Sequence, residues 1–196
     1  MSSGTVAGYF LQVVPTACLA GIIYLIIRLT VLKKRKAPPA WGAELLRLLF
    51  VCYLTGLVSL VILPANFWLY VYDGIFLGWW EGLGNIFRIG NVNLLPSVIK
   101  WLKGELSVGS WVRTMLIGNI AMFVPLGLLL PPVFGIEDRR RMLFFSAVIP
   151  LACETLQLFF GRSFDTDDLI CNFLGILIGV AAAFAIQKLK RTVRGE

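Results

Sequence analysis

The chain contains no histidine, and charged residues make up only 15% of its 196 residues. The absence of histidine excludes catalytic triads that use histidine, metals held by histidine and histidine proton switches. The hydrophobic share of 58% is too high for an ordinary soluble domain, which is about half apolar and about a quarter charged. The sequence therefore predicts an integral membrane protein with one membrane domain.

Cysteine is also scarce, and its four copies form no CxxC pair. We interpret Cys18, Cys52, Cys153 and Cys171 as small buried hydrophobic residues rather than as disulfides or metal ligands. We expect no cofactor and no bound metal. The net charge of +7 arises from basic residues beside apolar segments, which is typical of membrane topology signals and not of a nucleic-acid partner.

The fold class expected is an all-α polytopic membrane helix bundle. A helix needs about 20 apolar residues to cross the hydrocarbon core. Five such spans are predicted, at residues 8–32, 48–65, 113–130, 142–160 and 169–186. The first has no basic segment before it, so we expect an anchor and not a cleaved signal. We expect Arg28 to extend toward the interface from its last turns, and Pro131 and Pro132 to end the third span.

Three regions are predicted along the chain. Residues 1–47 form an N-terminal transmembrane helix and a basic loop, residues 48–186 a membrane domain, and residues 187–196 a basic tail. Between the second and third spans, residues 73–111 are rich in glycine and tryptophan. Tryptophan favours the membrane interface, and Pro96 opens a short amphipathic helix over residues 94–102. We expect this segment, with Trp79, Trp80 and Trp101, to lie on the membrane surface.

The distribution of lysine and arginine predicts the orientation. Twelve lie in the loop after the first span, the loop after the third span and the tail, whereas five lie on the opposite side and Arg28 is within a span. The protein is therefore expected in the cell membrane as a multi-pass protein, with the N-terminus outside and the C-terminus in the cytoplasm. The residues around Arg162 would then face outward.

Polar residues of three spans are predicted at similar depth near this outer side. Asn119 lies about six residues, or roughly 9 Å, into the third span, and Glu154 lies at about the same depth in the fourth. Asn172 lies near the start of the fifth span. Gln157 shares a helix face with Glu154, and a stripe along the fifth span includes Gly175. The stripe residues are Asp168, Asn172, Gly175 and Gly179, of which the two glycines form a GxxxG pair.

Each of these residues also has a structural interpretation. Asn119 and Asn172 can simply bond neighbouring helices, and Gln157 is expected to be structural. The acidic turn can be solvated, with Asp167 or Asp168 capping the fifth span. For Glu154 a functional role is favoured over a structural one, because inserting a charge near a helix centre costs roughly 2.5–3.5 kcal/mol on insertion scales.

The residues also resemble a known family. The motifs are N-I-A-M-F-V-P-L-G at 119–127, Glu154 with Gln157, G-R-S-F-D-T-D-D-x-x-x-N-x-x-G at 161–175, and N-L-L-P at 93–96. In combination they are similar to the VanZ-like family, over residues 51–179. The resemblance implies a Gram-positive cell-envelope protein associated with resistance to the lipoglycopeptide antibiotic teicoplanin. It supplies no established catalytic set. The motif positions are Asn119, Phe123, Pro125, Gly127, Glu154, Gln157, Arg162, Asp165, Asp168, Asn172 and Gly175.

Three functions are compatible with this sequence. The favoured one is a non-enzymatic protein whose polar residues bind an outer-leaflet amphiphile, such as a lipoglycopeptide or a lipid-linked cell-wall precursor, among membrane lipids. The alternative is an intramembrane enzyme on lipid-linked phosphates, with Glu154, Asp165 and Asp168 as acid–base groups or Mg²⁺ ligands and Arg162 as a phosphate clamp. A transporter ranks last because no inverted repeat is evident. The ligand-binding candidates are Asn119, Glu154, Gln157, Arg162, Asp165, Asp168 and Asn172.

Overall fold

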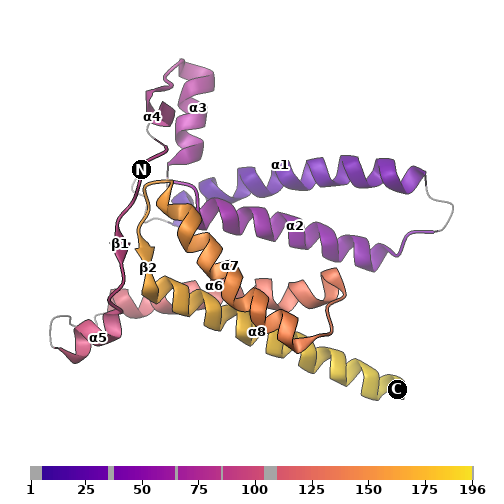
Figure 1. The fold of residues 1–196 in the computed structure, drawn as a ribbon. Coiled ribbons are helices and arrows are strands. Elements are labelled where there is room, and N and C mark those ends of the chain that lie inside the picture. The colour runs from indigo at the N-terminus through magenta and orange to yellow at the C-terminus, as the bar shows by residue number, and fades with distance from the viewer. Residues whose placement is uncertain (1–5, 35–37, 65, 85, 104–109, 196) are drawn as a thin grey trace. The chain divides into compact units, whose positions relative to one another are not determined.

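A computed structural model describes residues 6–34, 38–64, 66–84, 86–103 and 110–195 (Figure 1). Arg35 and Lys36 of the basic loop, and Ala65 at the predicted end of the second span, lie outside this part. The described chain divides into two compact units, each formed by two stretches. The first unit is Met1–Gly90 with Leu156–Arg162, and the second is Asn91–Thr155 with Ser163–Glu196.

The described elements are almost all helices, and five of them are long and apolar enough to cross a membrane. The candidate spans are Val13–Lys33, Trp41–Val61, Thr114–Phe134, Arg139–Leu158 and Thr166–Val193. The predicted all-α, multi-pass membrane bundle is confirmed. Between the second and third spans, the longest described helix is α3 (Phe67–Leu77), whose eleven residues are too few to cross the hydrocarbon core.

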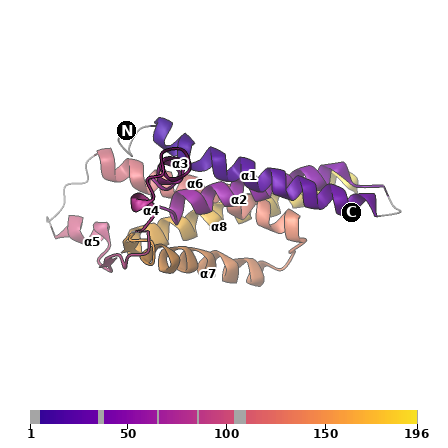
Figure 2. The ribbon, with the colours of Figure 1, turned by 90° about the horizontal axis from the view of Figure 1, so that it is seen from above.

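In the first unit, α1 (Val6–Lys33) and α2 (Trp41–Val61) lie side by side (Figures 1 and 2). Glu44 in the first turns of α2 accepts hydrogen bonds from Nε and Nη2 of Arg28, both at 2.5 Å, and from Nη1 of Arg47 at 2.8 Å. The predicted start of this span at residue 48 was wrong, because these ion pairs allow charged residues inside the helix. We also expected the Arg28 side chain to extend to the membrane interface, but it contacts Glu44 instead.

Polar side chains also join the apolar faces of this unit. The Thr16 hydroxyl of α1 donates to the Ser59 hydroxyl of α2 at 2.9 Å, and Trp68 Nε1 of α3 donates to Thr16 at 2.8 Å. The structure adds α3 and the short α4 (Glu81–Gly84), neither of which the sequence predicted. Trp79 and Trp80 are exposed, whereas the side chains of Trp101 and Trp111 lie outside the described part.

The second unit contains β1 (Val92–Asn93), α5 (Ser97–Leu102), α6 (Ser110–Phe134), most of α7 (Arg139–Leu158), β2 (Phe164–Asp165) and α8 (Thr166–Arg194). Its main packing is between α6 and α8, where glycines on both helices let the backbones touch. A Cβ built on Gly175 would overlap the carbonyl oxygen of Ile120 and lie 2.9 Å from Cβ of Phe123. Gly179 and Gly127 face similar backbone contacts. This is the close approach that small residues permit in membrane helices.

The C-terminus of α6 differs from the prediction. Pro131 and Pro132 lie inside the helix, which continues to Phe134. Gly135 then adopts a φ of +65°, and the N–H of Ile136 donates to the carbonyl of Pro131 at 3.0 Å. This six-to-one bond around a left-handed glycine is a Schellman motif, so glycine and not proline ends the helix.

The four cysteines are free thiols, and only Cys171 is buried. The expectation that all four are buried was wrong for Cys18, which is exposed on α1, and Cys52 and Cys153 are only half-buried. The side chains that fill the second unit come from facing positions on its long helices. Phe123 and Leu126 of α6, Met142 of α7 and Ile176 of α8 are almost fully buried.

Candidate functional site

The polar site of the second unit begins where α8 starts. Asp165 ends β2, and its side chain accepts the N–H of Asp167 at 2.9 Å, which makes Asp165 the N-cap of α8. The prediction that Asp167 or Asp168 caps this helix was therefore wrong by two or three residues. An aspartate at this position satisfies one of the unpaired N–H groups of the first turn and suits the helix dipole.

Glu154 on α7 lies directly against this start of α8. Its Oε2 accepts the backbone N–H of Asp165 at 3.1 Å, and its Oε1 accepts Nδ2 of Asn172 at 3.4 Å. Glu154 is 1% exposed and Asn172 is 3% exposed. Oδ1 of Asn172 is buried with no hydrogen-bond partner among the described residues. The pair thus combines a buried carboxyl group with a buried acceptor that is unsatisfied.

Asp167 connects α8 to the segment that follows β1. Both of its carboxylate oxygens accept the backbone N–H of Ser97, at 3.1 and 2.8 Å, where α5 begins. The neighbouring Thr166 hydroxyl donates to the carbonyl of Asn93 at 3.2 Å. Because Ser97 has Pro96 before it and α5 after it, Asp167 fixes the point at which the chain turns into that helix.

Asn93 provides a second connection in the same place. Its Nδ2 donates to Asp165 Oδ2 at 2.9 Å, and its Oδ1 accepts Nζ of Lys100 at 3.2 Å. The backbones of β1 and β2 pair in parallel beside these contacts, with Val92 opposite Phe164 and Asn93 opposite Asp165. The segment after β1 is therefore bound to the start of α8 by both backbone and side chains.

Asn119 brings α6 to the same site, because its Nδ2 donates to Asp168 Oδ1. We refer to these carboxyl and amide side chains as the acid–amide cluster. Its members are Asn93, Asn119, Glu154, Asp165, Asp167, Asp168 and Asn172. They come from α6, α7, α8 and the two strands. Every helix and strand of the second unit except α5 therefore contributes a side chain to the cluster.

Two of the seven sequence candidates belong to the first unit. Arg162 donates from Nη1 to the carbonyls of Leu60 and Leu63, at 3.0 and 3.5 Å, where α2 ends. A cation at the C-terminus of a helix satisfies unpaired carbonyls and suits the dipole. Gln157 is buried, and its carbonyl accepts the N–H of Arg162 at 3.1 Å across the turn at Gly161, whose φ is +73°. The contacts of the Arg162 side chain support a structural role, whereas the bond at Gln157 is made by its backbone and does not test the role of its side chain.

The other five candidates, Asn119, Glu154, Asp165, Asp168 and Asn172, lie together in the cluster. Sequence reasoning missed three contributors, namely Asn93, Ser97 and Asp167. The signal for Asn93 was the N-L-L-P motif at 93–96, which lies next to the acidic turn in space, and Ser97 directly follows that motif. Asp167 was expected to be a solvated or capping residue because an aspartate in a short turn is usually solvated. In the structure it is buried against Ser97.

The chemistry of the cluster is that of hydrogen-bond acceptance. Each of its four carboxyl groups accepts at least one amide N–H, so none is an isolated charge. Among the described residues, no group of three or more acidic or cysteine side chains is arranged to hold a metal ion. The cluster can therefore bind donors such as hydroxyl and amide groups.

Comparison with known proteins identifies one match. The family model for VanZ/LLP1 matches residues 50–187, which include all the members of the acid–amide cluster and exclude α1, the loop after it and the first nine residues of α2. A search of curated proteins finds no match, and a search of solved structures finds none either.

Proposed function

The chain belongs to the VanZ/LLP1 family, and from that premise we propose that its acid–amide cluster binds the polar end of an outer-leaflet amphiphile. The ligand class is a lipoglycopeptide or a lipid-linked cell-wall precursor, which combines an acyl or prenyl chain with hydroxyl and amide groups. Binding would contribute to tolerance of teicoplanin-type glycopeptides in a Gram-positive envelope. Neither role requires a covalent step.

One observation carries the proposal, which is the unsatisfied acceptor of Asn172 beside Glu154. A buried acceptor without a donor costs about 1–3 kcal/mol, so a ligand N–H or O–H that reaches it gains affinity. The neighbouring carboxyl groups of Asp165 and Asp168 are only half-buried and provide further acceptors. Acceptors in an apolar unit suit a ligand whose head is rich in donors and whose tail is apolar.

The proposed orientation places this cluster outside the cell. It rests on the excess of lysine and arginine in the loop after α1, the start of α7 and the end of α8. With the N-terminus outside and the C-terminus in the cytoplasm, the turn at Gly161 faces outward. A cell-wall precursor or an antibiotic would then reach the cluster from the outer leaflet.

The proposal is tested with the purified protein in nanodiscs and a fluorescent lipoglycopeptide. Asn172→Leu and Glu154→Leu should lower the affinity at least about tenfold, because each removes a buried polar contact worth about 1.4 kcal/mol or more. Glu154→Gln should retain binding if only hydrogen bonding matters and lose it if the charge matters. Ser146→Ala is the matched control, since Ser146 is also buried on α7 but bonds only its own helix.

The outcomes separate binding from the other interpretations. Normally folded Asn172→Leu and Glu154→Leu proteins with unchanged affinity would overturn the proposal. Release of phosphate from a polyprenyl diphosphate, lost in the same variants, would favour the enzyme instead. Antibiotic tolerance in cells should fall in parallel with affinity and not with protein abundance.

Orientation is tested separately in intact cells. In a variant whose four native cysteines are replaced by alanine, Ser163→Cys should react with an impermeant thiol reagent before lysis, because Ser163 is exposed in the outward turn. Lys190→Cys on the exposed face of α8 should react only after lysis. The reverse pattern would invert the topology.

A further inference from the structure

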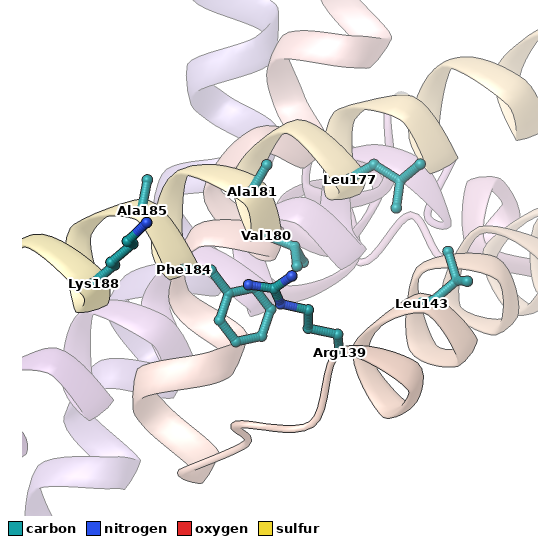
Figure 3. A pocket seen from close by; sticks show the side chains of 8 residues that line it. All are labelled: Arg139, Leu143, Leu177, Val180, Ala181, Phe184, Ala185 and Lys188. Carbon is teal, nitrogen blue, oxygen red and sulfur yellow. The ribbon is translucent and has the colours of Figure 1, made fainter.

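A groove lies between the start of α7 and the second half of α8, away from the acid–amide cluster. Its volume is about 520 Å³, and most of its lining is apolar (Figure 3). Arg139 and Lys188 provide its cationic side chains. The apolar lining consists of Leu143, Leu177, Val180, Ala181, Phe184 and Ala185. All these residues belong to the second unit.

The length of the groove matches one lipid leaflet. From Leu177 to Lys188 the helix advances eleven residues, or roughly 16 Å. This is about half of the roughly 30 Å hydrocarbon thickness of a bilayer. A chain that lies along the groove with its head at Lys188 therefore has its apolar end near mid-membrane. Two apolar residues, Leu143 and Leu177, mark that inner end.

At the cationic end, Arg139 contacts an aromatic ring and not a carboxylate. The Arg139 guanidinium lies over the Phe184 ring, 5.8 Å from its centroid, in the geometry of a cation–π contact. Among the described residues, neither Arg139 nor Lys188 forms an ion pair. Figure 3 shows the Arg139 side chain extending toward α8, between Phe184 and Val180. Cations without an ion-pair partner beside an apolar wall suit an anionic head group.

A smaller cavity of about 230 Å³ continues the groove at this end. It shares Arg139, Phe184 and Lys188 with the groove and adds Glu137, Gln187 and Arg191. Glu137 accepts Nη2 of Arg191 at 2.9 Å, so one carboxylate offsets one of the three cations. The remaining excess of positive charge complements a phosphate, and the side-chain amide of Gln187 can bond a glycerol hydroxyl.

We propose that this groove binds an anionic phospholipid, with the phosphate at Arg139 and Lys188 and an acyl chain along the apolar wall. Basic pockets between transmembrane helices recognise lipid phosphates by this combination of charge and apolar contact. Charge complementarity selects an anionic lipid over a neutral one. This inference is independent of the ligand of the acid–amide cluster.

The test is native mass spectrometry of the full chain with phosphatidylglycerol and phosphatidylcholine that carry the same acyl chains. Phosphatidylglycerol should bind more tightly, and Arg139→Gln with Lys188→Gln should reduce its affinity roughly tenfold or more. The charge-matched control is Arg140→Gln with Lys190→Gln, because both residues are exposed and line neither cavity. The control should retain the preference.

A second pair of variants tests the groove without changing charge. Ala181→Trp should fill the apolar wall and reduce phosphatidylglycerol binding, whereas Ala182→Trp points elsewhere on α8 and should not. Equal binding of the two lipids, or equal loss in the two members of each pair, would overturn the proposal in favour of annular lipid only.

Discussion

The helix pair α1–α2 and the helix pair α6–α8 are held together by different means. Between α1 and α2, the close contacts of Gly21 and Gly56 are with side chains, the Cys52 sulfur and a Val13 methyl, each 2.9 Å from a Cβ built on the glycine. Ion pairs and hydroxyl groups supply the rest. Between α6 and α8, the glycines meet backbone atoms directly. Only 6% of the α1 span is buried, compared with 39% of the α8 span.

The difference indicates which of the two helix contacts tolerates substitution of its glycines. A side chain that meets a glycine can move to another rotamer, whereas a carbonyl group moves only with its helix. The α6–α8 contact lies inside the region that matches the family, and the whole of α1 lies outside it. The backbone contact is therefore the part of the structure expected to fail first when it is altered.

The largest effect is expected from Gly175→Ala, which places a methyl group against the Ile120 carbonyl. The helices must separate, and the free energy of unfolding should fall by about 3 kcal/mol. Gly118→Ala is the matched control, because a Cβ there meets nothing within 4 Å. Thermal unfolding in detergent, followed by size-exclusion fluorescence, measures both. Equal unfolding temperatures would show that the backbone contact is not limiting.

A smaller loss is expected from Glu44→Leu, which leaves Arg28 without its bidentate partner. Removing one member of a charge pair strands the other, whereas replacing both is often neutral. The double variant Arg28→Leu, Glu44→Leu should therefore recover most of the unfolding temperature lost by the single variant. A double-mutant cycle measures this coupling. Additive losses would contradict a specific pair.

Asp167→Ala tests whether side-chain contacts in the second unit matter to its helices. Loss of the hydrogen bond to the Ser97 N–H should cost about 1.5 kcal/mol and act locally. Hydrogen exchange of the amides from Ser97 to Leu102 should accelerate, while α6 and α8 remain protected. Asp167→Asn keeps one acceptor oxygen and should show a weaker effect. Accelerated exchange throughout α8 would mean that the cluster holds the helices and not only α5.

The smallest effect is expected from Ser59→Ala, which removes the acceptor for the Thr16 hydroxyl. Hydrogen bonds between membrane helices contribute about 0.6 kcal/mol on average. The unfolding temperature should therefore shift only slightly. A loss as large as that of Gly175→Ala would show that the α1–α2 contact is as demanding as the α6–α8 contact.

Much of this structure follows from the length of the apolar segments, whereas most of what the sequence did not predict involves partners distant in sequence. The spans were predicted because about 20 apolar residues in succession have few alternatives. The start of α2 was missed because Glu44 looks solvated until Arg28 is known to contact it. The end of α6 was missed because prolines were given more weight than Gly135. At the cluster, Asn119, Glu154 and Asn172 were identifiable as buried polar residues, whereas the roles of Asn93 and Asp167 depend on a strand pairing that the sequence did not signal.

The parallel pairing of β1 with β2 has a consequence for the order of assembly. Asn93 and Asp165 are 72 residues apart, and Ser97 and Asp167 are 70 apart. Contacts this distant form only after the intervening chain has been made, and they are slow because a long loop must close first. During synthesis, the segment after β1 must wait unanchored until α6, α7 and the first turn of α8 have emerged. A ribosome that stalls before residue 165 would leave an exposed strand and unpaired amides, which make such a fragment prone to aggregation.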